Sequence, residues 1–236
     1  MPVAYITGGT KGIGLSVAEA LMQEGTHVLF TGRQQSDCDK VANQLNENDW
    51  DGRASGVAAD VRSLEAQKSA VAQAKEEFGE LPSIIIANAG LGHFASVIDM
   101  TEEQWNETID INLTGVFNSL KASLEGLIAH QGYFITIASL AGTNFFAKGA
   151  AYNASKFGLV GFTQAAMLDL RDQGIKVTTI MPGSVATYFN GNTPDESDAW
   201  KIQGEDIAQM VVDLLAMHPR TLPSKIEVRP SRPPKK

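Results

Sequence analysis

The chain has 236 residues, of which 43% are hydrophobic and 19% charged, and its net charge is −8 at pH 7. This size suits one domain with a substantial core, and the negative charge argues against a nucleic-acid partner, because binding a phosphate backbone requires a basic surface. Cys38 is the only cysteine, and the chain shows neither a signal-peptide pattern nor a long apolar run, so we expect a cytoplasmic protein with no internal disulfide and no membrane span.

Short apolar runs alternate with amphipathic stretches along the whole chain. Some runs, such as Ile84–Ala87, are apolar at every position, which is typical of strands covered on both faces. Repetition of strand and helix predicts a doubly wound α/β sheet of parallel strands with helices on both faces, in one domain spanning residues 1–236. The runs that we expect to form strands are Val3–Thr7, His27–Thr31, Ala54–Ala59, Ser83–Ala87, Tyr133–Ala138, Lys176–Met181 and Lys225–Val228.

A glycine-rich loop follows the first strand. It reads Thr7-Gly-Gly-Thr-Lys-Gly-Ile-Gly14 and leads directly into a helical pattern. Glycines allow a tight turn and let a phosphate approach the backbone N–H groups, and the start of the helix favours an anion. Its Gly8-x-x-x-Gly12-x-Gly14 spacing differs from the usual dinucleotide fingerprint, and a loop that only turns the chain is the alternative. We favour a dinucleotide site.

The end of the second strand bears on the choice of cofactor. NAD-binding proteins place an acidic residue there, which bonds the ribose 2′-hydroxyl. Here Gly32 and Arg33 occupy that position, and no acid occurs before Asp37. Gly32 leaves room, and Arg33 offers a charged fork for a 2′-phosphate, with Lys11 as a second cation. The alternative is that both cations are solvated surface charges. The pattern favours NADP.

Polar side chains follow the third and fourth strands, on the same edge as the glycine loop. Asp60-Val61 comes after the third strand, and its carboxylate could accept from an adenine amino group. Asn88-Ala89-Gly90 comes after the fourth, where Asn88 either contacts cofactor or only caps the loop. Asn112 lies in an otherwise apolar helical stretch, where an amide needs a partner.

The candidate catalytic groups are Ser139, Tyr152 and Lys156. Tyr152 and Lys156 are four residues apart and so share one face of a helix. Such a pair is common by chance, and a half-buried Tyr beside a solvated Lys is the alternative. Ser139, however, ends the apolar run Tyr133–Ala138, at the sheet edge where open α/β sheets bind ligands.

Taken together, these motifs resemble the short-chain dehydrogenase/reductase family in order and spacing. The resemblance extends from Val3 to Val228 and implies a Rossmann-like domain with a seven-stranded parallel sheet. It also implies hydride transfer between a nicotinamide cofactor and a carbonyl or alcohol. The motifs that carry it are Thr7-Gly-x-x-x-Gly-Ile-Gly14, Asp60, Asn88-Ala-Gly90, Asn112, Ser139, Tyr152-x-x-x-Lys156 and Pro182-Gly-x-x-x-Thr187.

The chemistry assigns a role to each catalytic candidate. A developing alkoxide needs a proton, which Tyr152 would supply while Ser139 orients the substrate oxygen. We expect Lys156, with the oxidised nicotinamide, to lower the pKa of Tyr152. The resemblance implies that Lys156 holds the nicotinamide ribose and that Asn112 holds a proton-relaying water. The expected cofactor-binding residues are Gly8, Thr10, Lys11, Gly12, Ile13, Gly14, Arg33, Asp60, Val61, Asn88, Ala89, Gly90, Tyr152, Lys156, Pro182, Gly183, Val185 and Thr187.

Substrate identity is less constrained. Residues 188–203 should form a short polar lid, and aromatic side chains near the catalytic groups suggest an apolar pocket. No metal is expected, because the four histidines are scattered. We expect an NADP-dependent carbonyl reductase or alcohol dehydrogenase acting on a small molecule; a 3-oxoacyl thioester reductase and a non-catalytic NADP-sensing protein are the alternatives. The candidate pocket residues are His93, Phe94, Phe145, Phe146, Tyr188 and Phe189.

Self-association is the last expectation. The helical stretches Thr101–His130 and Ala150–Asp172 offer a face for a homodimer, with a homotetramer as the larger possibility. The apolar and small positions expected there are Ala150, Ala151, Phe157, Val160, Ala165 and Leu168. The C-terminal segment 229–236 is basic and reads as a solvated or docking tail.

Overall fold

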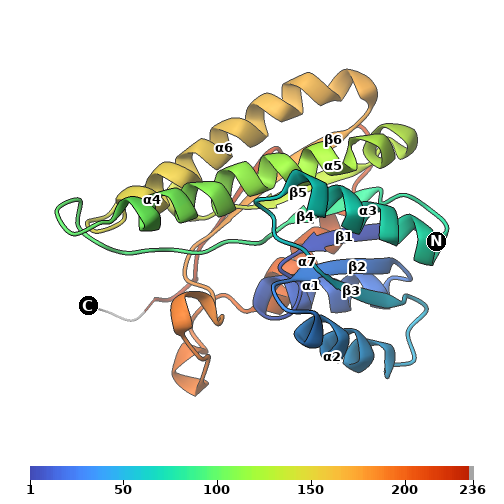
Figure 1. Ribbon diagram of the computed structural model, residues 1–236, viewed down its shortest axis with the longest axis horizontal. Helices are drawn as coiled ribbons and strands as arrows, with labels where there is room; N and C mark the ends of the chain where they lie inside the picture. The colour runs from blue at the N-terminus through green and yellow to red at the C-terminus, as the bar shows by residue number, and fades with distance from the viewer. Residues whose placement is uncertain (234–236) are drawn as a thin grey trace.

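The predicted apolar runs all form strands, shifted at their ends by at most one residue. The computed structural model describes residues 1–233, and in this part of the chain the strands join in one seven-stranded parallel sheet (Figure 1). The strands are β1 (Val3–Thr7), β2 (His27–Gly32), β3 (Ala54–Ala58), β4 (Ile84–Ala87), β5 (Tyr133–Ile137), β6 (Lys176–Pro182) and β7 (Lys225–Val228). The helices are α1 (Gly12–Gln23), α2 (Gln35–Asn46), α3 (Leu64–Phe78), α4 (Glu102–Ile109), α5 (Gly115–His130), α6 (Ala150–Leu170) and α7 (Gly204–Ala216).

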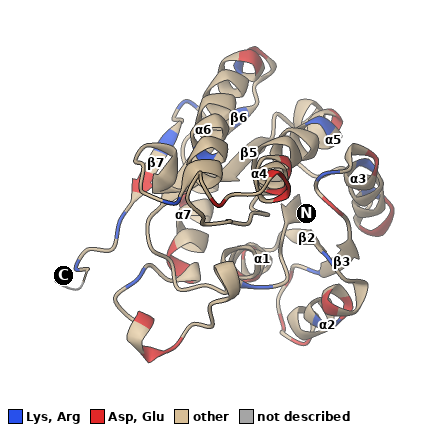
Figure 2. Ribbon diagram, turned by 60° about the vertical axis from the view of Figure 1, so that its left-hand side comes forward, with Lys and Arg blue, Asp and Glu red and all other residues tan. Residues whose placement is uncertain are grey.

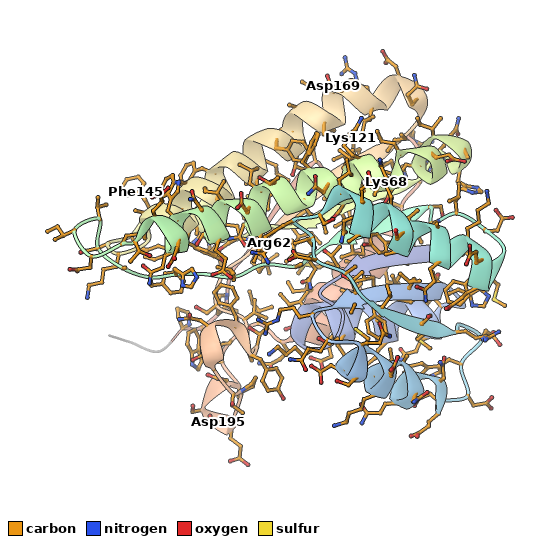
Figure 3. All side chains as sticks on the ribbon, viewed as in Figure 1. Arg62, Lys68, Lys121, Phe145, Asp169 and Asp195 are labelled. Atoms are coloured by element: carbon orange, nitrogen blue, oxygen red, sulfur yellow. The ribbon has the colours of Figure 1, made fainter. Side chains whose placement is uncertain are left out.

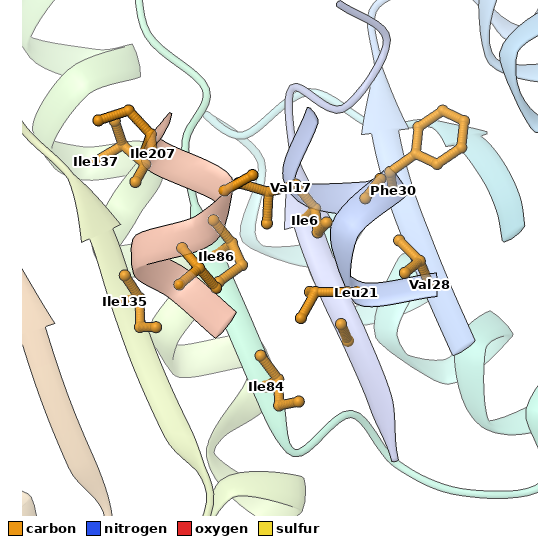
Figure 4. Close-up of a cluster of buried hydrophobic side chains, with 14 of the residues drawn as sticks. Ile6, Val17, Leu21, Val28, Phe30, Ile84, Ile86, Ile135, Ile137 and Ile207 are labelled. Carbon is orange, nitrogen blue, oxygen red and sulfur yellow. The ribbon is translucent and has the colours of Figure 1, made fainter. Parts of the chain in front are cut away.

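Both faces of the sheet are buried because successive strand side chains point to opposite faces and are apolar on both. Tyr5 packs with the layer of α3, α5 and α6, whereas Ile6 packs with the layer of α1 and α7. Figure 4 shows the second of these clusters, in which Val17 and Leu21 of α1 lie against strand residues such as Ile86. This two-sided core confirms the doubly wound α/β fold.

The strand order places a crevice beside β1. The order is β3-β2-β1-β4-β5-β6-β7, so the chain proceeds from β1 in one direction and then crosses to β4 on the other side. Thr7, the last residue of β1, is in register with Ala87, the last residue of β4. Ligands of open α/β sheets bind at such a reversal, outside the carboxyl ends of the strands. The glycine loop and Asn88 therefore start at the edges of this crevice.

The predicted helix Thr101–His130 is interrupted, and that expectation was wrong in one respect. Between α4 and α5 the segment Asp110–Thr114 forms a π-helical turn that contains the buried Asn112. A π turn inserts a residue into a helix and is frequent at functional sites. The second predicted helix, Ala150–Asp172, is closer to expectation: α6 ends at Leu170 and a 3₁₀ turn follows.

The C-terminal part of the chain closes one edge of the sheet. The N–H of Gly183 donates to the carbonyl of Val228 over 2.8 Å, and Arg229 pairs with Glu227 at 3.0 Å. The rest of the predicted basic tail falls partly in residues 234–236, which lie outside the described residues. Figure 2 shows Lys and Arg scattered over several helices and loops. Within residues 1–233, none of the helices combines the length and hydropathy that a membrane span needs.

Candidate active site

The glycine loop is held in shape by Asn88. The Asn88 side-chain amide donates to the carbonyls of Thr7 and Gly8, over 3.1 and 2.9 Å, and the Thr7 hydroxyl accepts the N–H groups of Asn88 and Ala89. Gly8 has a φ of 70°, a conformation that glycine adopts without strain. A Cβ at Gly14 would lie 2.3 Å from the Gly8 carbonyl oxygen. Asn88 thus caps the loop, and its contact with a cofactor stays a prediction.

The end of β2, where we expect the 2′-phosphate of NADP to bind, differs from expectation in one detail. A Cβ on Gly32 would meet the Thr10 methyl at 2.6 Å and the Cys38 sulfur at 2.7 Å. Gly32 is therefore also required by its own neighbours, and the room that it leaves for a 2′-phosphate stays a prediction. The same contact brings Thr10 onto the end of β2, and Lys11 and the exposed Arg33 are the next residues along the chain from Thr10 and Gly32. In residues 1–233 neither cation has a carboxylate within 4.0 Å.

Asp60 has a partner that the sequence alone does not reveal. The Arg62 guanidinium donates to its carboxylate through three bonds of 2.6, 2.9 and 3.0 Å, and the backbone N–H of Arg62 adds a fourth. These bonds hold the pKa of Asp60 below its usual range. The neighbouring Val61 is buried and packs on Gly115 at the start of α5. The Asp60 carboxylate is thus already bonded to Arg62, at a position close to the edge of the crevice.

Ser139, Tyr152 and Lys156 come together at the carboxyl end of β5. Tyr152 is 9% exposed, and the Lys156 ammonium lies 5.7 Å from the centre of its ring. Burial raises the pKa of Tyr152 and outweighs a hydrogen bond with Ser139, which lowers it. Lys156 is not among the causes of this shift. Among the protein's own groups, desolvation of the phenolate is therefore the larger effect, and the expected lowering by Lys156 with an oxidised nicotinamide stays a prediction.

Lys156 is buried beside Asn112 and Gly90. Its ammonium donates to the Ile137 carbonyl over 3.2 Å, and burial lowers its pKa to about 8. A Cβ at Gly90 would lie 3.7 Å from that ammonium and 3.2 Å from the Asn112 side-chain oxygen. Glycine at this position therefore lets the loop after β4 pass close to both side chains.

Replacing Lys156 by Met should stabilise the protein at pH 7 while lowering any catalytic activity. An unfolded lysine has a pKa of about 10.4, so the shift to about 8 costs the fold up to roughly 3 kcal/mol while the side chain is charged. Above pH 8 the folded protein loses this proton first, so wild-type stability rises with pH and the advantage of K156M shrinks. Thermal unfolding at about pH 7 and about pH 9.5 measures this, with the exposed Lys40→Met as control. An advantage that grows with pH would contradict the burial cost.

Asn112 links the loop after β4 to α6. Its amide nitrogen donates to the Leu91 carbonyl over 2.8 Å and to the Ser155 hydroxyl over 3.0 Å, and its oxygen accepts the Leu91 N–H. Ser155 in turn donates to the backbone carbonyl of Tyr152. The predicted need for a partner is thus met by protein groups. Ser155 was missed in the sequence, although a small hydroxyl residue directly before Lys156 was a signal.

Aromatic side chains pack against Tyr152. The ring of Phe94 lies 5.4 Å from that of Tyr152, Phe189 lies 5.7 Å from it, and Phe146 lies 5.9 Å from Phe94. Asn153, also missed, holds the loop that carries Phe146 by bonds to the Ala141 and Asn144 carbonyls. Two of the six candidate pocket residues therefore contact Tyr152, and Phe146 packs on one of them.

The other three pocket candidates have no aromatic contact with Tyr152, and their place in a pocket stays a prediction. Phe145 is 87% exposed, and Figure 3 shows it at the outer end of the upper helical layer. Tyr188 lies under the Lys11 ammonium, 5.5 Å from ring centre to nitrogen. His93 is bonded to Glu107 at 2.7 Å. Sequence position alone does not decide which side chains of a loop turn inward.

The segment after β6 approaches the glycine loop. A parallel bridge joins Val185 to Ile202 through bonds made by Ser184 and Ala186, so the N–H and C=O of Val185 face the opposite side. A Cβ at Gly12 would lie 3.5 Å from Thr187. Pro182 and Gly183 begin this segment at the end of β6. The cradle of glycines and free backbone groups fits a dinucleotide.

Comparison with known proteins agrees with this geometry. A family model described as short chain dehydrogenase matches residues 2–198. The chain belongs to the short-chain dehydrogenase family. An uncharacterised oxidoreductase of Staphylococcus saprophyticus is 32% identical over 229 residues, which cover 97% of each chain. This short-chain dehydrogenase is thus an oxidoreductase of a family that typically uses NAD(P), and a small-molecule substrate is expected from membership.

Two solved structures resemble this short-chain dehydrogenase over nearly its whole length. An alcohol dehydrogenase of the archaeon Thermococcus sibiricus, complexed with 5-hydroxy-NADP, has a TM-score of 0.91 and 26% identity and covers 100% of both chains. A metagenomic short-chain oxidoreductase in complex with NADP has a TM-score of 0.84 and 30% identity and covers 98% of both chains. Within residues 1–233, no group of His, Cys, Asp and Glu side chains is arranged to hold a metal ion.

Proposed function

We propose that this short-chain dehydrogenase is an NADP-dependent carbonyl reductase or alcohol dehydrogenase that acts on small to medium, largely apolar substrates. The observation that carries the proposal is a buried tyrosine at the end of β5, close to a buried lysine and covered by aromatic rings. NADPH, when bound across the glycine loop, supplies the hydride. The remaining chemistry belongs to side chains of the chain itself.

Tyr152 is suited to give a proton to the carbonyl oxygen. Its raised pKa keeps the phenol protonated at neutral pH, which is the form that an acid needs in reduction. Ser139 would donate a second hydrogen bond and orient the same oxygen. Lys156 would hold the ribose hydroxyls and, with an oxidised nicotinamide, favour the phenolate needed for alcohol oxidation. Asn112 would hold the predicted water next to Lys156.

NADP is the proposed form of the cofactor because the end of β2 has cations and no acid. The structural relatives in complex with NADP or its derivative support this choice. Gly8, Gly12, Ile13 and Gly14 would surround the pyrophosphate at the start of α1, and Asp60 and Val61 would lie beside the adenine. Val185 would meet the carboxamide through its backbone.

Changing Arg33 to Ala should weaken NADPH binding by roughly 10- to 100-fold and NADH binding by less than about threefold, because a charge-assisted bond to phosphate is lost. Cofactor titration by fluorescence measures both constants. The exposed Lys40→Ala, which removes a similar charge from α2, is the control. Equal losses for the two cofactors would exclude a role of Arg33 at the 2′-phosphate.

A panel of ketones, aldehydes and alcohols assayed with both cofactors tests the proposed activity. Reduction of aryl and alkyl ketones with NADPH is the expected result. A rate on acetoacetyl-coenzyme A far above these would favour the 3-oxoacyl thioester alternative. Tight NADPH binding without turnover of any compound would indicate the NADP-sensing alternative instead.

We also propose self-association through α5 and α6. Apolar side chains stay exposed on this face, among them Phe117 and Ile128 of α5 and Phe157 and Leu168 of α6. Of the predicted face residues, Ala151 is fully buried and cannot contribute. Exposed apolar groups gathered on one face are typical of an interaction surface. Sedimentation equilibrium should show at least a dimer at micromolar concentration, and a monomer there would contradict the proposal.

A further inference from the structure

One helical segment holds the loop after β4 at two points. At the first, Asn112 in the π turn exchanges two hydrogen bonds with the backbone of Leu91. At the second, Glu107 at the end of α4 lies 2.7 Å from the Nε2 atom of His93. A carboxylate only accepts, so the imidazole N–H is the donor in this bond. The loop from residue 90 to residue 94 is therefore fastened on both sides of residue 92.

The π turn helps both side chains reach the same loop. Glu107 and Asn112 are five residues apart and would point in clearly different directions on a regular α-helix with 3.6 residues per turn. A π turn closes i→i+5 bonds and therefore rotates less for each residue. Because Asp110–Thr114 is such a turn, Asn112 is brought closer to the face of Glu107.

The residue after His93 is the aromatic ring that touches the catalytic tyrosine. Phe94 stands edge-on to Tyr152, with ring centres 5.4 Å apart, and also contacts Phe146 and Phe189. A Cβ on Gly92 would lie 2.9 Å from both Phe94 and Phe189. Space around the loop is thus tight, and a shift of the backbone at His93 would move the Phe94 ring.

We propose that the His93–Glu107 pair is a positioning device that fixes Phe94 against Tyr152 and thereby sets the preference for bulky apolar carbonyl substrates. This rests on the proposed carbonyl reductase activity. The catalytic lysine is held independently, through Ile137, and Asn112 has its own bonds to Leu91 and Ser155. Loss of the pair should therefore move Phe94. It should leave the proposed proton-transfer groups and the glycine loop in place.

Glu107→Ala and His93→Ala test the pair, with Glu103→Ala as matched control. Glu103 lies one turn earlier on α4, is exposed, and has no hydrogen-bonded or ionic partner in residues 1–233. Both test variants should raise KM for an aryl ketone roughly tenfold and change kcat by less than about threefold, since one charge-assisted bond is lost. KM for acetone, which has little apolar surface to place against the ring, and Kd for NADPH should stay within about twofold.

A double variant and a conservative variant test whether the effect comes from the His93–Glu107 interaction itself. H93A/E107A should be no worse than either single change, because both remove the same interaction. His93→Gln keeps a side-chain N–H at similar reach and should restore most of the aryl-ketone KM. Additive losses, equal losses for acetone and the aryl ketone, or weakened NADPH binding would each overturn the proposal.

Hydrogen exchange provides a readout that needs no substrate. Backbone amides in a peptide spanning residues 88–96 should exchange faster in E107A than in wild type, and at the wild-type rate in E103A. Unchanged exchange in E107A would overturn the positioning role even if the wild-type protein reduces no carbonyl. Faster exchange in E107A together with an inactive wild type would instead contradict the proposed activity. It would still support the role of the His93–Glu107 pair in holding the loop.

Discussion

Replacing Tyr152 by Phe should lower kcat for carbonyl reduction by at least about 10³-fold and change NADPH affinity by less than about threefold. Phe keeps the ring, and with it the packing against Phe94 and Phe189, and removes only the hydroxyl. In the proposed mechanism the developing alkoxide then loses its proton donor. Single-turnover rates with preloaded NADPH separate this chemical loss from binding.

Tyr133→Phe is the matched control for this variant. Tyr133 is another buried tyrosine, and its hydroxyl is bonded to Thr178 at 2.7 Å inside the sheet core. Its removal should cost about 1 kcal/mol of stability and leave turnover nearly unchanged. Retained turnover in Y152F would show that another group is the acid.

Replacing Gly14 by Ala should weaken NADPH binding by at least about 100-fold and destabilise the fold by roughly 2–4 kcal/mol. The new methyl group would lie 2.3 Å from the Gly8 carbonyl oxygen and 2.6 Å from the Asn88 amide nitrogen. Relief of this overlap requires the Asn88 amide to leave Thr7 and Gly8, and the phosphate loop then loses its shape. Calorimetric NADPH titration and urea unfolding measure the two effects.

Gly79→Ala separates loss of stability from loss of cofactor. Gly79 ends α3 with a φ of 81°, and a Cβ there would meet nothing within 4 Å. The variant should cost about 1 kcal/mol through backbone strain and leave NADPH affinity at the wild-type value. If G14A bound NADPH as tightly as G79A does, the close packing of the loop on Asn88 would not matter for binding.

The sheet was predictable because its strands are apolar on both faces. Ile84–Ala87, for example, has no solvent-facing position, and a short run of this kind is typical of a strand covered by two layers. The π turn at Asp110–Thr114 was not predictable in this way. A single inserted residue leaves a continuous helical pattern before and after it, so periodicity over a long stretch does not reveal where it lies.

The site was predictable where backbone geometry imposes a residue type. Gly14 and Gly90 are glycines because other groups of the protein crowd them, and their motifs mark the crevice. Partner choice was not predictable: Asp60 bonds Arg62, and His93 bonds Glu107, through contacts that depend on the folded arrangement. The pKa of Tyr152 also depends on burial, which a motif does not report.

The hydrogen bonds of Asn88 have a consequence for folding during synthesis. Its amide fixes the carbonyls of Thr7 and Gly8, residues made about eighty positions earlier in synthesis. A nascent chain that leaves the ribosome therefore exposes the whole glycine motif long before β4 docks beside β1 and Asn88 arrives. Cofactor binding on a growing chain should begin only after that docking, and a fragment of residues 1–80 would contain the motif without the shape that binds a dinucleotide.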